Sequence, residues 1–407
     1  MALRVLVLCI ESPSRIWGGR GTHVKYLYDA MQGLVDIHYV TLDPEWTERW
    51  YSHSTPWGEN YYWVPGDKGI KNMLANTTAL FKHCLKLHAE KPFDLIHAHE
   101  FDMVEPALHL RDTLGIPVVT TFHLFQNEIA RIEGCRGTEE ERYCLALERI
   151  GLAQSDRAIL VSQAMRCFAE DKLQIKRPYD VLLNGVDLAE FESVKEWQPH
   201  EGKIKALYCG RIAYQKGVEP LLQAIEQSHE VIDWTIVGKL AALEEQDVWN
   251  HPYYKKLVEL RDSGKIRWPG HLEGQAKIDE FERCDCVVMP SVCEPFGIVA
   301  LEAMAAGRVL VHTGVDGLAE FCTQENSIKI QPTAESIIDG VLSVKTCDYD
   351  ELVATAAATA MEKKHDWRNI AQRVVKIYEE VAHGNIGISR KRGARSEAWA
   401  SYDRDRA

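Results

Sequence analysis

The 407-residue sequence has no apolar run long enough to cross a membrane, no cysteine framework and no excess of positive charge. The apolar run at residues 5–10 is too short and too poorly flanked for a signal peptide, and it predicts a first β-strand. The 11 cysteines are scattered, and neither close pair, Cys284/Cys286 or Cys135/Cys144, has the second pair that a zinc site requires. We therefore expect reduced, mostly buried thiols and a cytoplasmic location.

The formal net charge of −13 argues against nucleic acid or an anionic membrane as a partner. A basic stretch at residues 390–395 keeps a nucleic-acid contact open. We expect no transmembrane segment, and the sequence does not determine the oligomeric state. The composition, 46% hydrophobic and 26% charged, is that of a globular protein.

Short apolar runs alternate with helical patterns along most of the chain. The expected strands of the first half are 5–10, 93–100, 116–123, 155–162 and 180–183. After a charged linker at 192–203, a second series follows at 204–209, 234–237, 266–268, 286–289, 309–312 and 328–330. Strands that alternate with helices pair in parallel through right-handed crossovers. The predicted fold class is therefore α/β, with two facing Rossmann-like domains and an inter-domain cleft.

The stretch from Asp285 to Glu302 is the most informative part of the sequence. A buried strand is followed by a break at Glu294-Pro-Phe-Gly297 and then by an apolar helical segment from Ile298. A helix that starts just past the carboxyl end of a strand presents free N–H groups, which suit an anion. Glu294 and Glu302 would then flank a phosphate site and hold sugar and ribose hydroxyls. The alternative is an acid that complements the helix dipole, together with a solvated glutamate.

Two further segments place glycine or basic side chains at strand ends. Gly18 and Gly19 precede a first helix that we expect to begin at Thr22, a favourable N-cap residue. Glycine there lets the backbone approach a phosphate, although ordinary turns use such pairs just as often. Arg211 and Lys216 lie close to a helix start, where cations do not complement the dipole. They are either surface charges or ligands for an anion held between them.

Polar residues close two of the expected strands in the first half. His97, His99 and Glu100 end one strand, and His123 ends the next. Ligands of an open α/β sheet bind beyond the carboxyl ends of the strands. His99 and Glu100 are therefore candidates for the cleft, whereas we expect His97 to face the sheet interior. The strand pattern alone leaves His123 either packed and hydrogen-bonded or catalytic.

Residues 43–75 are rich in tryptophan, tyrosine, proline and glycine. The aromatic residues include Trp46, Trp50, Trp57, Tyr61, Tyr62 and Trp63. Stacked rings could form a platform for an acceptor sugar. The alternative, which we favour slightly, is that the rings seal a long irregular loop.

Together these motifs resemble those of a known family. Glu294-Pro-Phe-Gly297, with Glu302 eight residues after Glu294, resembles the paired-glutamate motif of retaining, nucleotide-sugar-dependent glycosyltransferases of the two-domain GT-B type. The resemblance is strongest to the large family that includes glycogen-synthase-like and sucrose-synthase-like enzymes. The Gly-Arg…Lys-Gly segment at 210–217, the Thr-Phe-His123 strand end and the first glycine loop match the family's other motifs in order.

The resemblance implies a role for each candidate residue. His123 and Glu294 would be catalytic, with His99 and Glu100 on the acceptor side. Donor binding would fall to Gly18, Gly19, Arg211, Lys216, Phe296, Gly297, Ile298, Val299 and Glu302. No cofactor and no metal is implied, because basic side chains and a helix N-terminus would stabilise the leaving diphosphate.

The resemblance also implies a division of the chain. Residues 1–195 would be the acceptor-side domain and 196–365 the nucleotide-sugar-binding domain. The stretch 350–380 is predicted to be helical, with residues 366–383 crossing back to the first domain and 384–407 forming a tail. Trp367, Ile370, Val374 and Ile377 form the apolar stripe of this predicted helix.

The activity implied is transfer of a sugar from a nucleotide diphosphate sugar to an acceptor hydroxyl, with a glucan or another saccharide as the expected acceptor. Lipid, nucleic-acid and small-molecule acceptors are the alternatives. Residues 1–195 carry 21 Lys+Arg against 27 Asp+Glu, which argues against a membrane-bound acceptor. A non-catalytic sugar-nucleotide-binding protein and a two-domain epimerase are further alternatives, and the ordered motif set argues against both.

Overall fold

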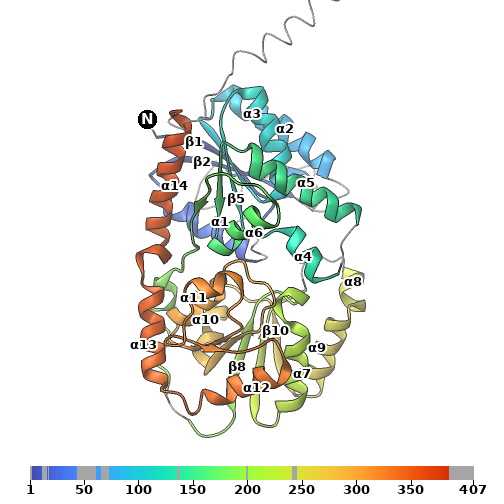
Figure 1. Ribbon diagram of the computed structural model, residues 1–407, viewed down its shortest axis with the longest axis vertical. Helices are drawn as coiled ribbons and strands as arrows, with labels where there is room; N and C mark the ends of the chain where they lie inside the picture. Colours follow the sequence, from blue (N-terminus) through green and yellow to red (C-terminus); the bar gives the residue numbers. More distant parts are fainter. Residues whose placement is uncertain are drawn as a thin grey trace, which may run out of the picture.

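In the computed structural model of the protein, the described residues are 2–11, 16, 18–43, 61–65, 73–134, 138–198, 200–240 and 245–384. They form two α/β domains stacked along the long axis of the molecule (Figure 1). Within this described part, the first parallel sheet has 7 strands in the order β3-β2-β1-β4-β5-β6-β7, and the second has 6 in the order β10-β9-β8-β11-β12-β13. The predicted α/β class with two Rossmann-like domains is confirmed.

The first domain is built on a parallel sheet with buried central strands. Its strands are β1 (Arg4–Leu8), β2 (Asp36–Asp43), β3 (Tyr61–Pro65), β4 (Leu95–His99), β5 (Val118–Phe122), β6 (Arg157–Leu160) and β7 (Asp180–Val181). Its helices are α1 (Gly19–Ala30), α2 (Met73–Glu90), α3 (Val104–Leu114), α4 (Gln126–Ile132), α5 (Glu139–Gln154) and α6 (Gln163–Asp171). Every residue of β1, β4 and β5 is buried, as expected for parallel strands covered on both faces.

The second domain repeats this arrangement. Its strands are β8 (Ile204–Cys209), β9 (Ile232–Val237), β10 (Ile266–Gly270), β11 (Cys286–Met289), β12 (Val309–His312) and β13 (Ile328–Lys329). Its helices are α7 (Val218–Ser228), α8 (Glu245–Asn250), α9 (Pro252–Asp262), α10 (Gly274–Arg283), α11 (Ile298–Ala305) and α12 (Ala334–Ser343). In both sheets the strand order reverses beside the first strand, between β1 and β4 and between β8 and β11. Such switch points open a ligand crevice at the carboxyl ends of the strands.

The C-terminal helical stretch consists of two helices. α13 (Tyr349–Ala360) covers the second domain, and α14 (Trp367–Ala382) runs beside the first (Figure 1). They are separated by a 3-10 turn at Lys363–His365, after which the Asp366 side chain caps α14 by accepting from the Arg368 N–H. The predicted stripe of α14 packs into the core formed by α1 and β1, so this helix ties the domains together.

Other local expectations need correction. The sequence patterns missed β2 and β3, and β3 shows that Tyr61–Pro65 is a paired strand rather than part of an irregular loop. Helix α1 begins at Gly19, not at Thr22, whose hydroxyl lies inside the helix and donates to the Gly18 carbonyl at 3.3 Å. The predictions for the other aromatic residues of this segment, Trp46, Trp50 and Trp57, and for residues 385–407, fall outside the described residues.

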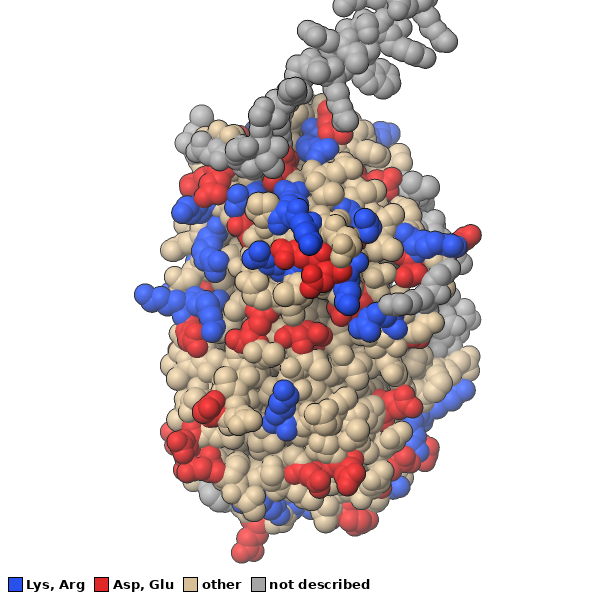
Figure 2. All heavy atoms as spheres, viewed as in Figure 1, with Lys and Arg blue, Asp and Glu red and all other residues tan. Residues whose placement is uncertain are grey.

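The described helices include none that is both long and apolar enough to cross a membrane. On the face of the molecule shown in Figure 2, basic and acidic side chains are intermixed over the first domain.

Candidate active site

A cavity of about 940 Å³ lies between the two domains, at the carboxyl ends of both sheets. Its lining includes every predicted donor-binding residue, both predicted catalytic residues and Glu100: Gly18, Gly19, Glu100, His123, Arg211, Lys216, Glu294, Phe296, Gly297, Ile298, Val299 and Glu302. His99 is the candidate that does not line it, since it is fully buried and its ring stacks on that of His123 at 5.3 Å between centroids. Residues distributed over almost 300 positions of the chain thus meet in one cavity.

The N-terminus of α11 opens into this cavity. Gly297 has a φ of 99°, and a β-carbon there would lie 2.5 Å from the Leu318 side chain, so only glycine fits. Within the described part of the chain no side chain caps this helix end, which leaves first-turn N–H groups at Ile298 and Val299 for a ligand. The Phe296 ring is buried and stacks on Phe321 at 5.1 Å between centroids. Phe296 therefore offers its backbone rather than its ring.

The glycine loop of the first domain meets the second domain across the cavity. A β-carbon on Gly18 would lie 3.6 Å from Arg211 Cδ, and one on Gly19 would lie 3.8 Å from Ile298 Cδ1. Gly18 is also the N-cap residue of α1 and has no side chain to cap it, while the Glu11 carboxylate accepts from the N–H of Gly21 in the first turn. The N-termini of two helices and the Arg211 side chain therefore surround one space, an arrangement that favours an anion.

Glu294 forms a buried ion pair with Lys216. Glu294 Oε2 lies 2.7 Å from Lys216 Nζ and accepts a hydrogen bond from the Ser291 hydroxyl at 3.1 Å. Its backbone N–H donates to Asp316 Oδ2 at 2.9 Å. Glu294 and Lys216, which were predicted to act separately, therefore contact each other directly. This contact fixes the Glu294 carboxylate at the cavity wall.

Glu302, in the second turn of α11, has a lysine partner that sequence reasoning missed. Lys277 on α10 places Nζ 2.6 Å from Glu302 Oε1. Burial lowers the pKa of Lys277, but the charge and hydrogen bond of Glu302, together with the nearby Cys209 and Glu190, raise it by more, so the pKa lies above its usual value. The second carboxylate oxygen, Oε2, is buried and has no partner within the described chain. It is available for a hydroxyl donor in the cavity.

Glu100 holds the backbone that carries His123. Its Oε1 accepts from the N–H groups of His123 at 2.5 Å and of Leu124 at 3.0 Å. Burial raises the pKa of Glu100 to about 8. Its backbone φ of 71° lies in a region that non-glycine residues rarely adopt. The residue thus fixes the loop after β5, with its second oxygen left without a described partner.

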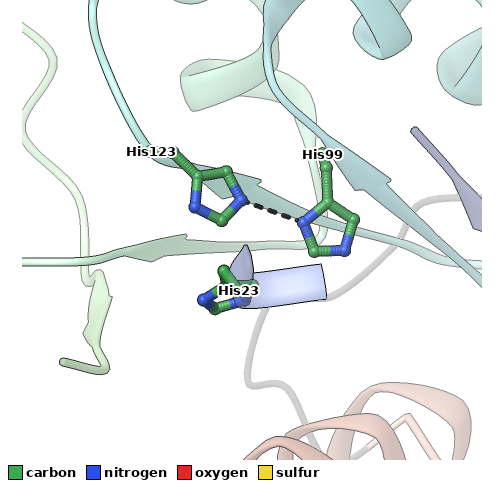
Figure 3. A group of neighbouring side chains, drawn as sticks. All are labelled: His23, His99 and His123. Carbon is green, nitrogen blue, oxygen red and sulfur yellow. Dashed lines mark hydrogen bonds between the residues drawn. The ribbon is translucent and has the colours of Figure 1, made fainter. Parts of the chain in front are cut away.

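His123 ends a chain of buried, hydrogen-bonded side chains. Its Nε2 lies 3.0 Å from His99 Nδ1, and His99 Nε2 lies 2.7 Å from the Tyr28 hydroxyl (Figure 3 shows the two rings). The Tyr28 hydroxyl continues to His97 Nδ1 at 2.9 Å. Burial and then the neighbouring His23 and Arg20 lower the pKa of His123 well below its usual value. The imidazole is therefore neutral at pH 7, with Nδ1 unpartnered in the described structure.

The glycine loop is anchored by Arg20, Glu11 and Asp102, which the sequence patterns also missed. Arg20 donates to Glu11 at 3.0 Å and to Asp102 at 2.8 Å, and the Gly21 N–H donates to Glu11 Oε2 at 3.0 Å. These bonds tie the start of α1 to the segments that follow β1 and β4. No local pattern revealed them, since the partners lie as far as 82 positions apart.

Family comparisons cover both domains. The family model described as Glycosyltransferase Family 4 matches residues 17–190, and the one described as Glycosyl transferases group 1 matches residues 190–373. The glycogen synthase of Mycobacterium tuberculosis is 26% identical over 415 aligned residues, which cover 94% of this chain and 96% of that protein.

Solved structures show the same architecture. The sucrose-phosphate synthase of Thermosynechococcus elongatus superposes with a TM-score of 0.79 at 17% identity, over 94% of this chain and 100% of that one. HepE of Anabaena, solved in complex with UDP and glucose, superposes with a TM-score of 0.70 at 16% identity, over 93% of this chain and 99% of that one. With residues 17–190 and 190–373 matched in order by two glycosyltransferase family models, the chain belongs to the glycosyltransferases with the GT-B fold.

Proposed function

We propose that the protein is a retaining glycosyltransferase that moves a sugar from a nucleoside diphosphate sugar to a hydroxyl of a saccharide acceptor. The observation that carries the proposal is the convergence on one cavity of Arg211, Lys216 and the N-termini of two helices, one from each domain. Two lysine-paired glutamates and a neutral histidine line the same space.

The diphosphate of the donor fits between the domains. Arg211 offers a planar fork and Lys216 a mobile charge, and the N–H groups near Gly19 and Ile298 approach from opposite sides. These groups stabilise the negative charge that develops on the leaving diphosphate, without a metal ion. The free Oε2 of Glu302 suits the ribose hydroxyls. Each contact uses a different part of the nucleotide, so the donor binds in one orientation.

The sugar then lies between His123 and Glu294. The unpartnered Nδ1 of neutral His123 is the hydrogen-bonding atom for a sugar hydroxyl, and Glu294, fixed by Lys216 and Ser291, holds hydroxyls of the same ring. The bond from the anomeric carbon to the diphosphate breaks while the acceptor oxygen bonds to the same face. The acceptor proton passes to the departing phosphate oxygen. Retention of configuration in this scheme follows from the family resemblance.

One of the chain's relatives and its charge support a saccharide acceptor. Glycogen synthase aligns with nearly the whole chain, and a HepE structure contains UDP and glucose. A lipid acceptor remains the second candidate. The intermixed charges over the first domain (Figure 2) and its excess of acidic residues argue against it.

The test begins with the donor. Thermal-shift measurements against ADP-, UDP-, GDP- and TDP-sugars identify the nucleotide, and donor-hydrolysis assays then show whether the protein is catalytic. Product NMR with oligosaccharide acceptors gives the anomeric configuration. An inverted product refutes the retaining mechanism, and binding of a donor without hydrolysis or transfer supports a non-catalytic sugar-nucleotide-binding protein instead.

A further inference from the structure

Three histidines from separate elements converge beside the cavity. His23 lies on α1, His99 ends β4 and His123 follows β5 (Figure 3). One ring nitrogen of each lies within 4.8 Å of those of the other two, a spacing compatible with a single metal ion. The side chains are 2%, 0% and 9% exposed. The catalytic scheme above uses only His123 and leaves the other two rings without a chemical role.

The environment of His23 fixes its protonation. Its Nδ1 lies 2.6 Å from Asn184 Oδ1, and an amide oxygen can only accept, so Nδ1 carries the proton. Its Nε2 is therefore a bare lone pair, and this buried atom has no hydrogen-bond partner in the described structure. An acceptor that is buried without a donor is costly. A histidine that binds a metal through one ring nitrogen commonly donates the N–H of its other ring nitrogen to an oxygen, as His23 does to Asn184.

His99 can present a lone pair through a change of tautomer. The Tyr28 hydroxyl lies 2.7 Å from His99 Nε2 and 2.9 Å from His97 Nδ1. It can accept from His99 Nε2–H while donating to His97, which frees Nδ1 of His99. The nitrogen atoms of His99 and His123 are 3.0 Å apart. Two imidazoles on a tetrahedral zinc ion, with bonds of about 2.0–2.1 Å, hold their nitrogens roughly 3.3 Å apart, which is close to the present separation of this pair.

The local charges permit a cation. Burial lowers the pKa of His23 to about 4 and those of His99 and His123 well below their usual value. The rings are thus unprotonated at neutral pH, as metal ligation requires. Arg20 is the nearby positive charge, and it is held by the carboxylates of Glu11 and Asp102. The ion would enter through the cavity, which His123 lines.

We propose that His23, His99 and His123 form a binding site for a divalent transition-metal ion of the Zn²⁺ type, with a fourth coordination position open to the cavity. Three imidazoles and one open position are a common zinc arrangement. The metal is not needed for transfer. Because a bound ion fixes the ring of His123, it would inhibit turnover reversibly, a consequence that rests on the proposed function.

The experiment measures metal binding directly. Chelator-treated full-length protein is titrated with Zn²⁺ by calorimetry and with Co²⁺ by visible absorption, in a buffer that does not coordinate metals. Wild type should bind one equivalent, with the intense visible bands of tetrahedral Co²⁺ and no thiolate charge-transfer band. His23→Asn and His99→Asn should each weaken binding at least ~100-fold, because each removes one of three ligands.

His312→Asn is the matched control. His312 is 2% exposed, bonds Ser327 through Nε2 at 2.9 Å and has an Nδ1 without a described partner, yet it lies in the second domain. This variant should bind metal as wild type does. Circular dichroism and diphosphate binding check that each variant folds, and the Co²⁺ spectrum of wild type stands independently of them. Absence of binding, a thiolate band, six-coordinate Co²⁺ or equal loss in His312→Asn overturns the proposal.

Discussion

Replacing Lys277 with methionine tests how the structure holds Glu302. The Lys277–Glu302 contact is 2.6 Å long, and the two side chains are 23% and 8% exposed. The pair is therefore largely shielded from water. Methionine keeps the apolar part of the lysine side chain and removes its charge, which leaves a buried carboxylate without a partner. Breaking a buried pair in this way costs about 3–5 kcal/mol of unfolding free energy.

This loss of unfolding free energy is large enough to measure by thermal unfolding. At about 2–4 °C per kcal/mol for a folding unit of 150–250 residues, Tm should fall by roughly 6–20 °C. Lys86→Met is the control, since Lys86 and Glu90 form a 4.0 Å pair with side chains 74% and 61% exposed. An exposed pair contributes about 0–1 kcal/mol. Similar losses in the two variants would refute the argument from burial.

The double variant Lys277→Met/Glu302→Leu separates stability from donor binding. Replacing a buried ion pair with apolar residues is often neutral, so Tm should recover most of the way to the wild-type value. Affinity for the nucleoside diphosphate should not recover, because the ribose loses its carboxylate, at about 1.5–3 kcal/mol or roughly ten- to a hundredfold. Calorimetry with the diphosphate identified by the donor screen measures it. A double variant that binds as tightly as wild type would show that Glu302 is not a donor ligand.

Three further changes test the rest of the site. His123→Ala should lower kcat at least ~10²-fold and leave diphosphate affinity intact, measured by kinetics and calorimetry. Glu294→Gln should lower kcat at saturating donor without weakening diphosphate binding, since Lys216 loses a competing anion; weaker binding would contradict this. For Glu100, the folded pKa of about 8 exceeds the unfolded value of 4.5, so its contribution to stability is fully present below pH 4.5 and is lost as pH rises from there to about 8. The Tm of wild type relative to Glu100→Gln should fall accordingly, and a constant difference would contradict the pKa.

The fold was readable from sequence where strands are buried on both faces. The runs at Cys286–Met289 and Val309–His312 match β11 and β12 residue for residue, because an apolar run followed by a turn signal is a local property. β2 was missed because polar residues such as His38 and Thr41 interrupt its apolar pattern. These residues are nevertheless buried, and their burial depends on neighbouring strands and helices.

Local sequence patterns could not predict which lysines pair with Glu294 and Glu302. Lys216 and Glu294 are 78 positions apart, and Lys277 and Glu302 are 25 apart. Lys216 was placed in the cleft by its motif, but its contact with Glu294 depends on how the loops after β8 and β11 meet. Lys277 belongs to no motif, and its position on α10 resembles that of any surface lysine. Pairing across a parallel sheet is set by strand order, which a single sequence does not display.

The different expectations for His97 and His99 could have been corrected from the sequence itself. Residues two apart in a strand point to the same face of the sheet. If His97 faces the helices that cover the sheet, His99 must face them too. The structure shows this, since both rings contact the Tyr28 hydroxyl of α1. Only Glu100, one residue further and past the end of β4, turns toward the cavity. The end of a strand therefore predicts that a residue lies near the crevice. The face of the sheet to which that residue points then decides whether its side chain contacts the ligand or supports a side chain that does.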